Sequence, residues 1–151
     1  MQQLDYEEPM DAGAIRVEGI NRLANYSKPE PCIEMGVRIL DEIIQGQVDT
    51  GATFTCIDYK FYDEKLSGEL DLLANDGLVM HGANGRAIGV KGIVKLPVQY
   101  EDKYRETQRV TIRVVILEEL ATRLLLGRDF MFGANMIIDH EAKRIYCGEP
   151  R

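Results

Sequence analysis

Apolar and polar residues alternate along several short stretches of this chain. In residues 33–39 every second position is apolar, which is the period-two pattern of a strand with one buried face. Similar or continuous apolar runs predict further strands over 43–48, 53–57, 110–116, 124–126, 136–138 and 144–147. A chain with this many short strands is predicted to be mostly β.

A glycine-rich tetrapeptide, Gly82-Ala83-Asn84-Gly85, interrupts the pattern between residues 78–80 and 86–98. Asn-Gly flanked by apolar runs is a strong hairpin signal. The sequence therefore predicts a long hairpin with a glycine-rich tip. A helical turn or two is predicted over 59–66, and one short helix is predicted to begin near Arg128.

The first 31 residues differ in composition from the rest of the sequence. They hold six acidic and three basic residues, few β-branched residues, and a closing Ser-Lys-Pro-Glu-Pro. A helix over 14–24 would have only a narrow apolar face. Pro29 and Pro31 favour extended backbone after it. We expect 1–31 to be an acidic leader or linker, flexible or part helical, and 32–151 to be one folded domain.

Composition narrows the function classes. The chain has 151 residues, of which 45% are hydrophobic, and a formal charge of −7. The sequence has no cluster of basic residues, so we do not expect it to bind nucleic acid. No apolar run approaches the roughly 18 residues of a membrane span, so we expect no membrane partner either. No signal peptide is visible, and Cys32, Cys56 and Cys147 form no Cys-x-x-Cys pair. We expect a cytoplasmic or intracellular protein, retroelement particles included, that binds no metal and needs no cofactor.

The segment with the clearest chemical logic is Asp49-Thr50-Gly51-Ala52, which lies between two predicted strands. Glycine allows a tight turn and close approach of another chain, and the amides of Gly51 and Ala52 are positioned to donate to the carboxylate. Alone, Asp-Thr-Gly is more often an ordinary turn than a catalytic group. The surrounding sequence has to decide between these interpretations.

That sequence contains the predicted hairpin and then Leu124-Leu125-Leu126-Gly127-Arg128-Asp129-Phe130. In this order the three elements resemble the retropepsin-like aspartic proteases, most closely the retrotransposon branch and its domesticated cellular relatives. The resemblance covers about residues 32–147. It implies a closed β-barrel of the acid protease fold, with a flap hairpin and one short helix near the C-terminus.

The resemblance also implies a homodimer, because this chain carries one Asp-Thr-Gly and the family uses two. Asp49 and its symmetry mate would share one proton and activate a water for attack on a peptide bond. Thr50 would align the two loops, and Gly51 would receive the substrate backbone. The implied substrate is an extended peptide or a polyprotein, bound as an added strand.

Other positions match the family's substrate groove and its support. Terminal strands often build the family's dimer interface, so the apolar residues at 137, 145 and 146 are candidates for it. The residues expected to contact substrate are Gln47, Ala52, Thr53, His81, Gly82, Ala83, Asn84, Gly85 and Leu125. Those expected to support the catalytic loop are Leu126, Gly127, Arg128 and Asp129.

Two departures from the family pattern bear on the site. Gln47 stands where an apolar residue is usual, which predicts a more polar neighbouring pocket. Thr53 stands where many retroviral members carry an aspartate that pairs with the arginine of Gly-Arg. Arg128 is therefore expected to find another partner, either Asp58 or a carboxylate across the dimer interface.

Three functions stay open on these grounds. The first is a homodimeric aspartic endopeptidase for polyprotein processing or limited proteolysis. The second is a catalytically silent dimerisation or peptide-binding module of the same fold. The third is a monomeric precursor in which residues 1–31 hinder dimerisation.

Overall fold

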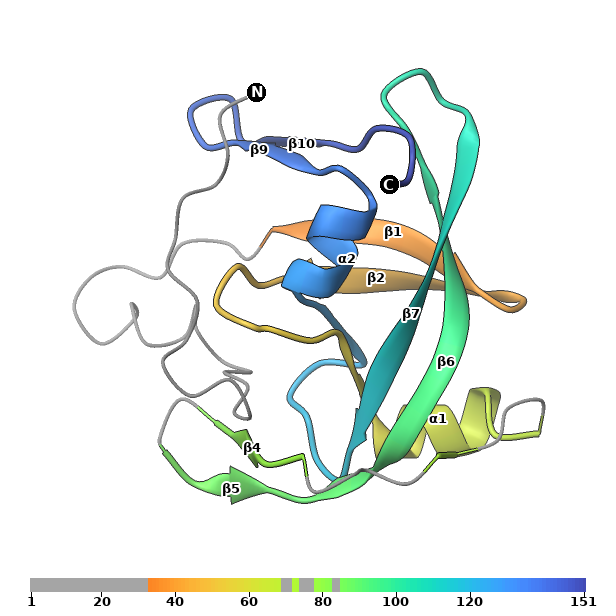
Figure 1. Cartoon of the computed structure of the whole chain (residues 1–151), viewed down its shortest axis with the longest axis vertical. Coiled ribbons are helices and arrows are strands. Elements are labelled where there is room, and N and C mark those ends of the chain that lie inside the picture. Colours follow the sequence, from red (N-terminus) through yellow and green to blue (C-terminus); the bar gives the residue numbers. More distant parts are fainter. Residues whose placement is uncertain (1–32, 69–71, 74–77, 83–84) are drawn as a thin grey trace.

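The computed structural model describes residues 33–68, 72–73, 78–82 and 85–151 (Figure 1). The predicted leader over 1–31 lies outside these residues, as do Cys32 at its boundary and Ala83 and Asn84 at the hairpin tip. The division of the chain at residue 32 therefore stays a prediction.

Six strands form a closed barrel, in the order β1-β2-β8-β3-β7-β6. The two longest, β6 and β7, are antiparallel partners that cross the molecule as one twisted ribbon (Figure 1). The predicted closed, mostly β barrel is confirmed. The bounds of its strands are Glu34–Ile39 (β1), Glu42–Val48 (β2), Cys56–Asp58 (β3), Val90–Glu101 (β6), Thr107–Leu117 (β7) and Leu124–Leu126 (β8).

The remaining helices and strands do not belong to the barrel sheet. Both predicted short helices are present, α1 over Tyr59–Lys65 and α2 over Arg128–Gly133. The predicted hairpin is present as β4 (Met80–His81) paired with β5 (Ala87–Ile88). It is shorter than predicted, because the chain from Val90 onward belongs to β6 and pairs with β7. Near the C-terminus, β9 (Ile137–Asp139) and β10 (Arg144–Tyr146) pair with each other within the chain.

The third strand begins later than the pattern predicts. The prediction was 53–57, whereas β3 begins at Cys56. The oxygen of Thr53 accepts instead from the N–H of Asp129, and the N–H of Thr55 donates to the Asp129 side chain, so these residues form a loop before β3. This part of the strand prediction was wrong.

Apolar residues inside the barrel form the main core, with contributions from every barrel strand. On β6 the alternation is strict, since Val94, Leu96 and Val98 are buried and Lys95 is exposed. Burial of one such side chain contributes about 1.5–3 kcal/mol. A second, smaller cluster lies under the β4–β5 hairpin and is called the hairpin cluster below. Its buried members are Ala52, Cys56, Met80, Val115, Leu117 and Leu125.

Candidate active site

Asp49 follows directly on β2, where that strand lies parallel to β8. Its N–H donates to the carbonyl oxygen of Leu126 over 3.0 Å. The residue is buried, with 2% of its surface exposed. The barrel therefore places one carboxylate at the end of a central strand, anchored through its own backbone.

The turn after Asp49 orients its side chain. The N–H of Gly51 donates to Oδ1 of Asp49 over 2.8 Å, as the sequence predicted. The N–H of Ala52 donates to the main-chain oxygen of Asp49 over 3.1 Å, and its predicted bond to the carboxylate stays a prediction. The amide of Gly51 holds the carboxylate, and the amide of Ala52 closes the turn. Thr50 lies between them, half-buried.

The junction between β8 and α2 supports this loop from a distant part of the chain. The N–H of Arg128 donates to the oxygen of Ala52 over 2.9 Å, and that of Asp129 donates to the oxygen of Thr53 over 3.3 Å. Gly127 is needed for this close approach, because a Cβ atom there would lie 2.5 Å from the carbonyl carbon and oxygen of Phe54. Leu126 is fully buried in the main core below.

Asp129 accepts three hydrogen bonds at this junction. Its Oδ1 accepts from the hydroxyl of Thr55 and from the N–H of Phe130, both over 2.7 Å. Its Oδ2 accepts from the N–H of Thr55 over 3.1 Å. Burial raises the pKa of the Asp129 carboxyl, and these bonds offset only part of that effect.

Thr55 is the residue of this site that sequence reasoning missed. It is fully buried, and its hydroxyl oxygen also accepts from the N–H of Gly127 over 3.1 Å. A hydroxyl between the apolar Phe54 and Cys56 is the only local signal, and threonine is common enough in strands that the signal does not stand out.

The β4–β5 hairpin covers this end of the barrel. Met80, paired with Ile88, is fully buried in the hairpin cluster, together with Ala52 and Leu125. At the tip, the N–H of Gly82 donates to the oxygen of Arg86 and the N–H of Gly85 to that of Gly82, each over 3.0 Å. Gly85 has a φ of 80°, a conformation that favours glycine.

The predicted substrate contacts fall into two groups. Gln47, Thr53, His81 and Gly82 are partly buried, and Gly85 is exposed. Ala52 and Leu125 have no exposed surface, because the hairpin cluster encloses both. Contact of all these residues with a substrate stays a prediction, and for Ala52 and Leu125 it requires movement of the hairpin.

Comparisons with family models and with curated proteins find no match for this chain. Among solved structures, the crystal structure of the retroviral protease-like domain of Ddi1 from Leishmania major is similar, with a TM-score of 0.56. The match covers 78% of this chain and 89% of that domain, at 16% sequence identity. The chain has the retropepsin-like fold. EIAV protease complexed with the inhibitor HBY-793 also matches, at 22% identity and a TM-score of 0.47, over 70% of this chain and 89% of that one.

Within this retropepsin-like fold, Arg128 has a partner that the sequence interpretation had excluded. Its side chain is buried, and Nη2 donates to the hydroxyl oxygen of Thr53 over 2.9 Å. Position 53 thus provides a partner after all, because a threonine hydroxyl also accepts a hydrogen bond. Pairing of Arg128 with Asp58 or with a carboxylate across the dimer interface stays a prediction. The carboxylate of Asp58 accepts from the N–H of Leu120 over 2.9 Å, which ties β3 to the segment before β8.

Cys56 lies beneath the Asp49 loop of the retropepsin-like barrel. It is fully buried, and its Sγ donates to the oxygen of Phe54 over 3.4 Å. Burial raises the pKa of its thiol well above the usual value, and the negative charges of Asp129 and Asp49 raise it further. The thiol is thus held in its protonated, unreactive form, and Cys56 packs in the hairpin cluster.

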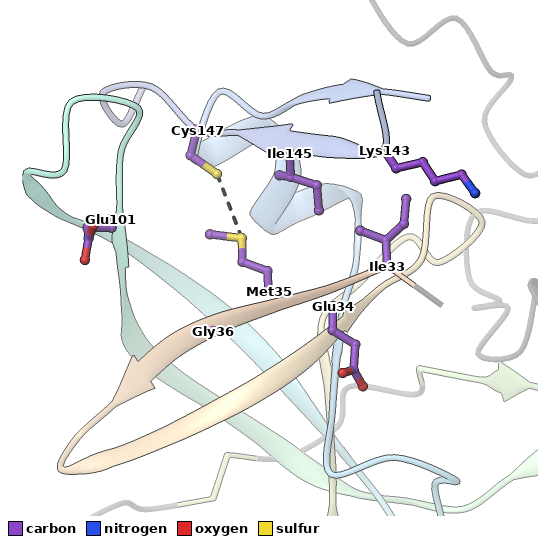
Figure 2. A pocket seen from close by; sticks show the side chains of 8 residues that line it. All are labelled: Ile33, Glu34, Met35, Gly36, Glu101, Lys143, Ile145 and Cys147. Carbon is purple, nitrogen blue, oxygen red and sulfur yellow. Dashed lines mark hydrogen bonds between the residues drawn. The ribbon is translucent and has the colours of Figure 1, made fainter. Parts of the chain in front are cut away.

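A cavity of about 380 Å³ lies elsewhere on the retropepsin-like barrel, between the start of β1, the end of β6 and β10 (Figure 2). Met35, Ile145 and Cys147 give it an apolar wall, on which the Cys147 and Met35 sulfurs lie 3.9 Å apart. Glu34, Glu101 and Lys143 surround that wall. None of the predicted substrate contacts lines this cavity.

Two further findings concern the described residues alone. No three His, Cys, Asp or Glu side chains among them gather in a way that suits a metal ion. No helix in the same part of the chain is long and apolar enough to span a membrane.

Proposed function

We propose that the chain is an aspartic endopeptidase that acts as a homodimer, with one Asp49 contributed by each copy. The observation that carries the proposal is the buried Asp49 carboxylate, held by the amide of Gly51 at the end of a barrel strand in a retropepsin-like fold. Because the chain contains one Asp-Thr-Gly, a two-carboxylate site requires a second copy.

The proposed chemistry follows from placing two carboxyl groups close together. Like charges at short range cannot both form cheaply, so the pair retains one proton and titrates as a unit. The ionised carboxylate takes a proton from a bound water, which attacks the scissile carbonyl carbon. The protonated carboxyl donates its proton to the carbonyl oxygen. These transfers give a tetrahedral gem-diol intermediate with no covalent bond to the enzyme. The carboxyl that took the proton from water passes it to the amide nitrogen, the C–N bond breaks, and the other carboxylate takes back a proton from the gem-diol.

The neighbouring residues have supporting roles in this proposal. Thr50 aligns the two loops across the symmetry axis, and Gly51 lets the substrate backbone approach the carboxylates. The β4–β5 hairpin closes over an extended peptide and excludes water. In this arrangement affinity comes from main-chain hydrogen bonds, and selectivity from side-chain pockets on alternating positions.

Two terminal strands are proposed to add to the dimer interface. Ile137 on β9 is 37% exposed, and Ile145 and Tyr146 on β10 are partly buried. Apolar side chains at a surface are suited to contact a second copy.

Incubation of the full chain with its own precursor and with an apolar-rich peptide library at mildly acid pH tests the proposal. The matched pair of variants is Asp49→Asn and Asp63→Asn, since Asp63 is exposed on α1. We expect cleavage by the wild type and by Asp63→Asn, and none by Asp49→Asn. Cleavage that persists in Asp49→Asn contradicts the proposal. A dimer in sedimentation that cleaves nothing favours the silent binding module instead.

A further inference from the structure

A single peptide group connects the Asp49 loop to the Asp129 carboxylate. It joins Leu126 to Gly127, and its carbonyl oxygen accepts from the N–H of Asp49 over 3.0 Å. The N–H of the same peptide group donates to the hydroxyl oxygen of Thr55 over 3.1 Å. Because a peptide group is planar, an acceptor that fixes its N–H also fixes the direction of its C=O.

The Thr55 hydroxyl is itself oriented by a charge. It donates to Oδ1 of Asp129 over 2.7 Å, which leaves a lone pair facing Gly127. The three hydrogen bonds of this series all run from donor to acceptor in the same direction, from the Asp49 N–H toward the Asp129 carboxylate. Hydrogen bonds arranged in series polarise one another, so each strengthens the next.

Neither Thr55 nor Asp129 is placed to touch a substrate. Thr55 has no exposed surface, and Asp129 uses both carboxylate oxygens on the junction itself. The Leu126–Gly127 peptide group carries their influence to the backbone N–H of Asp49 itself.

We propose that Asp129 and Thr55 are positioning residues for Asp49: Asp129 orients the Thr55 hydroxyl, and the hydroxyl orients the peptide group that holds the Asp49 backbone. This inference rests on the proposed function, because a displaced Asp49 matters for rate only if Asp49 acts on a peptide bond.

Thr55→Val and Thr55→Ser distinguish a positioning role of Thr55 from a packing role. Valine has the shape of threonine but neither donates to Asp129 nor accepts from Gly127. Serine lacks the methyl group but makes both bonds. A packing role for Thr55 would make serine the worse replacement, whereas the positioning role makes valine the worse one.

Steady-state kinetics of the full chain on a cleaved peptide tests this. For Thr55→Val we expect kcat to fall roughly ten- to a hundredfold with KM within about twofold, since small misplacements of a reacting group have effects of this size. Thr55→Ser should retain kcat within about threefold. Thr111→Val, at an exposed position on β7, is the control for loss of a hydroxyl. Equal losses in the valine and serine variants, or a change in KM alone, would overturn the inference.

Amide hydrogen exchange gives a readout that does not depend on cleavage. In Thr55→Val we expect protection of the Asp49 and Gly127 amides to fall roughly fivefold or more, the size expected for one lost hydrogen bond, while the β6 and β7 amides stay unchanged. Should the wild type cleave nothing, the proposed function fails and this measurement alone decides the inference. Unchanged protection at Asp49 rejects it.

Asp129→Asn is the alternative test variant if Thr55→Val does not fold. Its amide oxygen can still accept from the Thr55 hydroxyl, whereas its amide nitrogen would face the Thr55 N–H. We expect an intermediate loss of kcat and of Asp49 protection. A wild-type value for both quantities contradicts the role assigned to Asp129.

Discussion

Two aspartates, Asp102 and Asp129, each accept three hydrogen bonds, yet they differ in every other respect. Asp102 starts the β6–β7 turn and accepts from the N–H groups of Tyr104 and Glu106 and from the Gln108 side chain. Asp129 holds Thr55, which is 74 residues away in sequence. Hydrogen bonds, led by that of Gln108, lower the pKa of Asp102, whereas burial raises that of Asp129.

The difference shows that the same donor count has opposite effects in different surroundings. Asp102 lies in a turn with 6% of its surface exposed, and there its hydrogen bonds outweigh the effect of burial on its pKa. Asp129 lies between the Asp49 loop and the β8–α2 junction, where lost hydration outweighs three bonds. The turn aspartate shapes one hairpin, and the junction aspartate joins two parts of the candidate active site.

The largest effect is expected for Asp129→Ala. The variant leaves two N–H groups and one hydroxyl without their acceptor in a buried place, and each such loss costs about 1–3 kcal/mol. We expect urea unfolding to show a stability loss of about 3 kcal/mol or more. A loss below about 1 kcal/mol would mean that water replaces the carboxylate and that the junction is not sealed.

Gly127→Ala tests the same junction through its backbone. A methyl group there meets the carbonyl of Phe54 at 2.5 Å, so the loop has to move. We expect a stability loss of about 1–3 kcal/mol, typical of overpacking, together with a loss of peptide cleavage. Gly68→Ala is the control, because a Cβ atom at Gly68 meets nothing within 4 Å. Similar behaviour of the two variants would contradict the close approach at Gly127.

The two aspartates should give opposite slopes of stability against pH. For Asp129 the folded pKa is raised, so its contribution is present below the ordinary Asp pKa of about 3.9 and is lost as pH rises through the folded value. For Asp102 the folded pKa is lowered, so its contribution is present above about pH 3.9 and is lost as pH falls through the folded value.

Urea unfolding at several pH values from about 2 to 6 measures these slopes. As pH rises, the stability lost by Asp129→Asn relative to the wild type should become smaller. The stability lost by Asp102→Asn relative to the wild type should become larger. Parallel curves for the two variants would remove the electrostatic distinction between them.

The smallest effect is expected at the turn itself. Asp102→Asn retains one oxygen acceptor, and the bonds of Asp102 stay within one turn, so we expect a smaller shift of the urea midpoint than for Asp129→Asn. Peptide cleavage should stay at the wild-type level, because the turn has no bond to the Asp49 loop among the described residues. A larger shift for Asp102→Asn than for Asp129→Asn would reverse the comparison.

What the sequence predicted was local. Alternation at residues 33–39 located β1, and the turn glycine at position 85 marked the hairpin, because each signal lies within a few residues of its effect. The order of Asp49, the hairpin and Gly127-Arg128-Asp129 indicated the fold through resemblance. These elements needed no knowledge of which strands become neighbours.

What escaped prediction depends on residues that only the fold brings together. Thr55 and Asp129 meet because β3 pairs with β8 while β8 pairs with β2. The bond between Arg128 and Thr53 and the late start of β3 have the same origin. A hydroxyl has no sequence periodicity that reveals its partner, so such bonds become visible only in three dimensions.

The buried underside of the β4–β5 hairpin has a consequence for the choice of substrate. Met80 belongs to the same apolar cluster as Ala52 and Leu125, so lifting the hairpin exposes it to water at a cost of about 1.5–3 kcal/mol. Under the proposed function, a peptide with apolar side chains would cover that surface again, whereas a polar peptide would leave the cost in place. The hairpin would then discriminate between peptides before any chemical step, through the surface it must uncover to admit them.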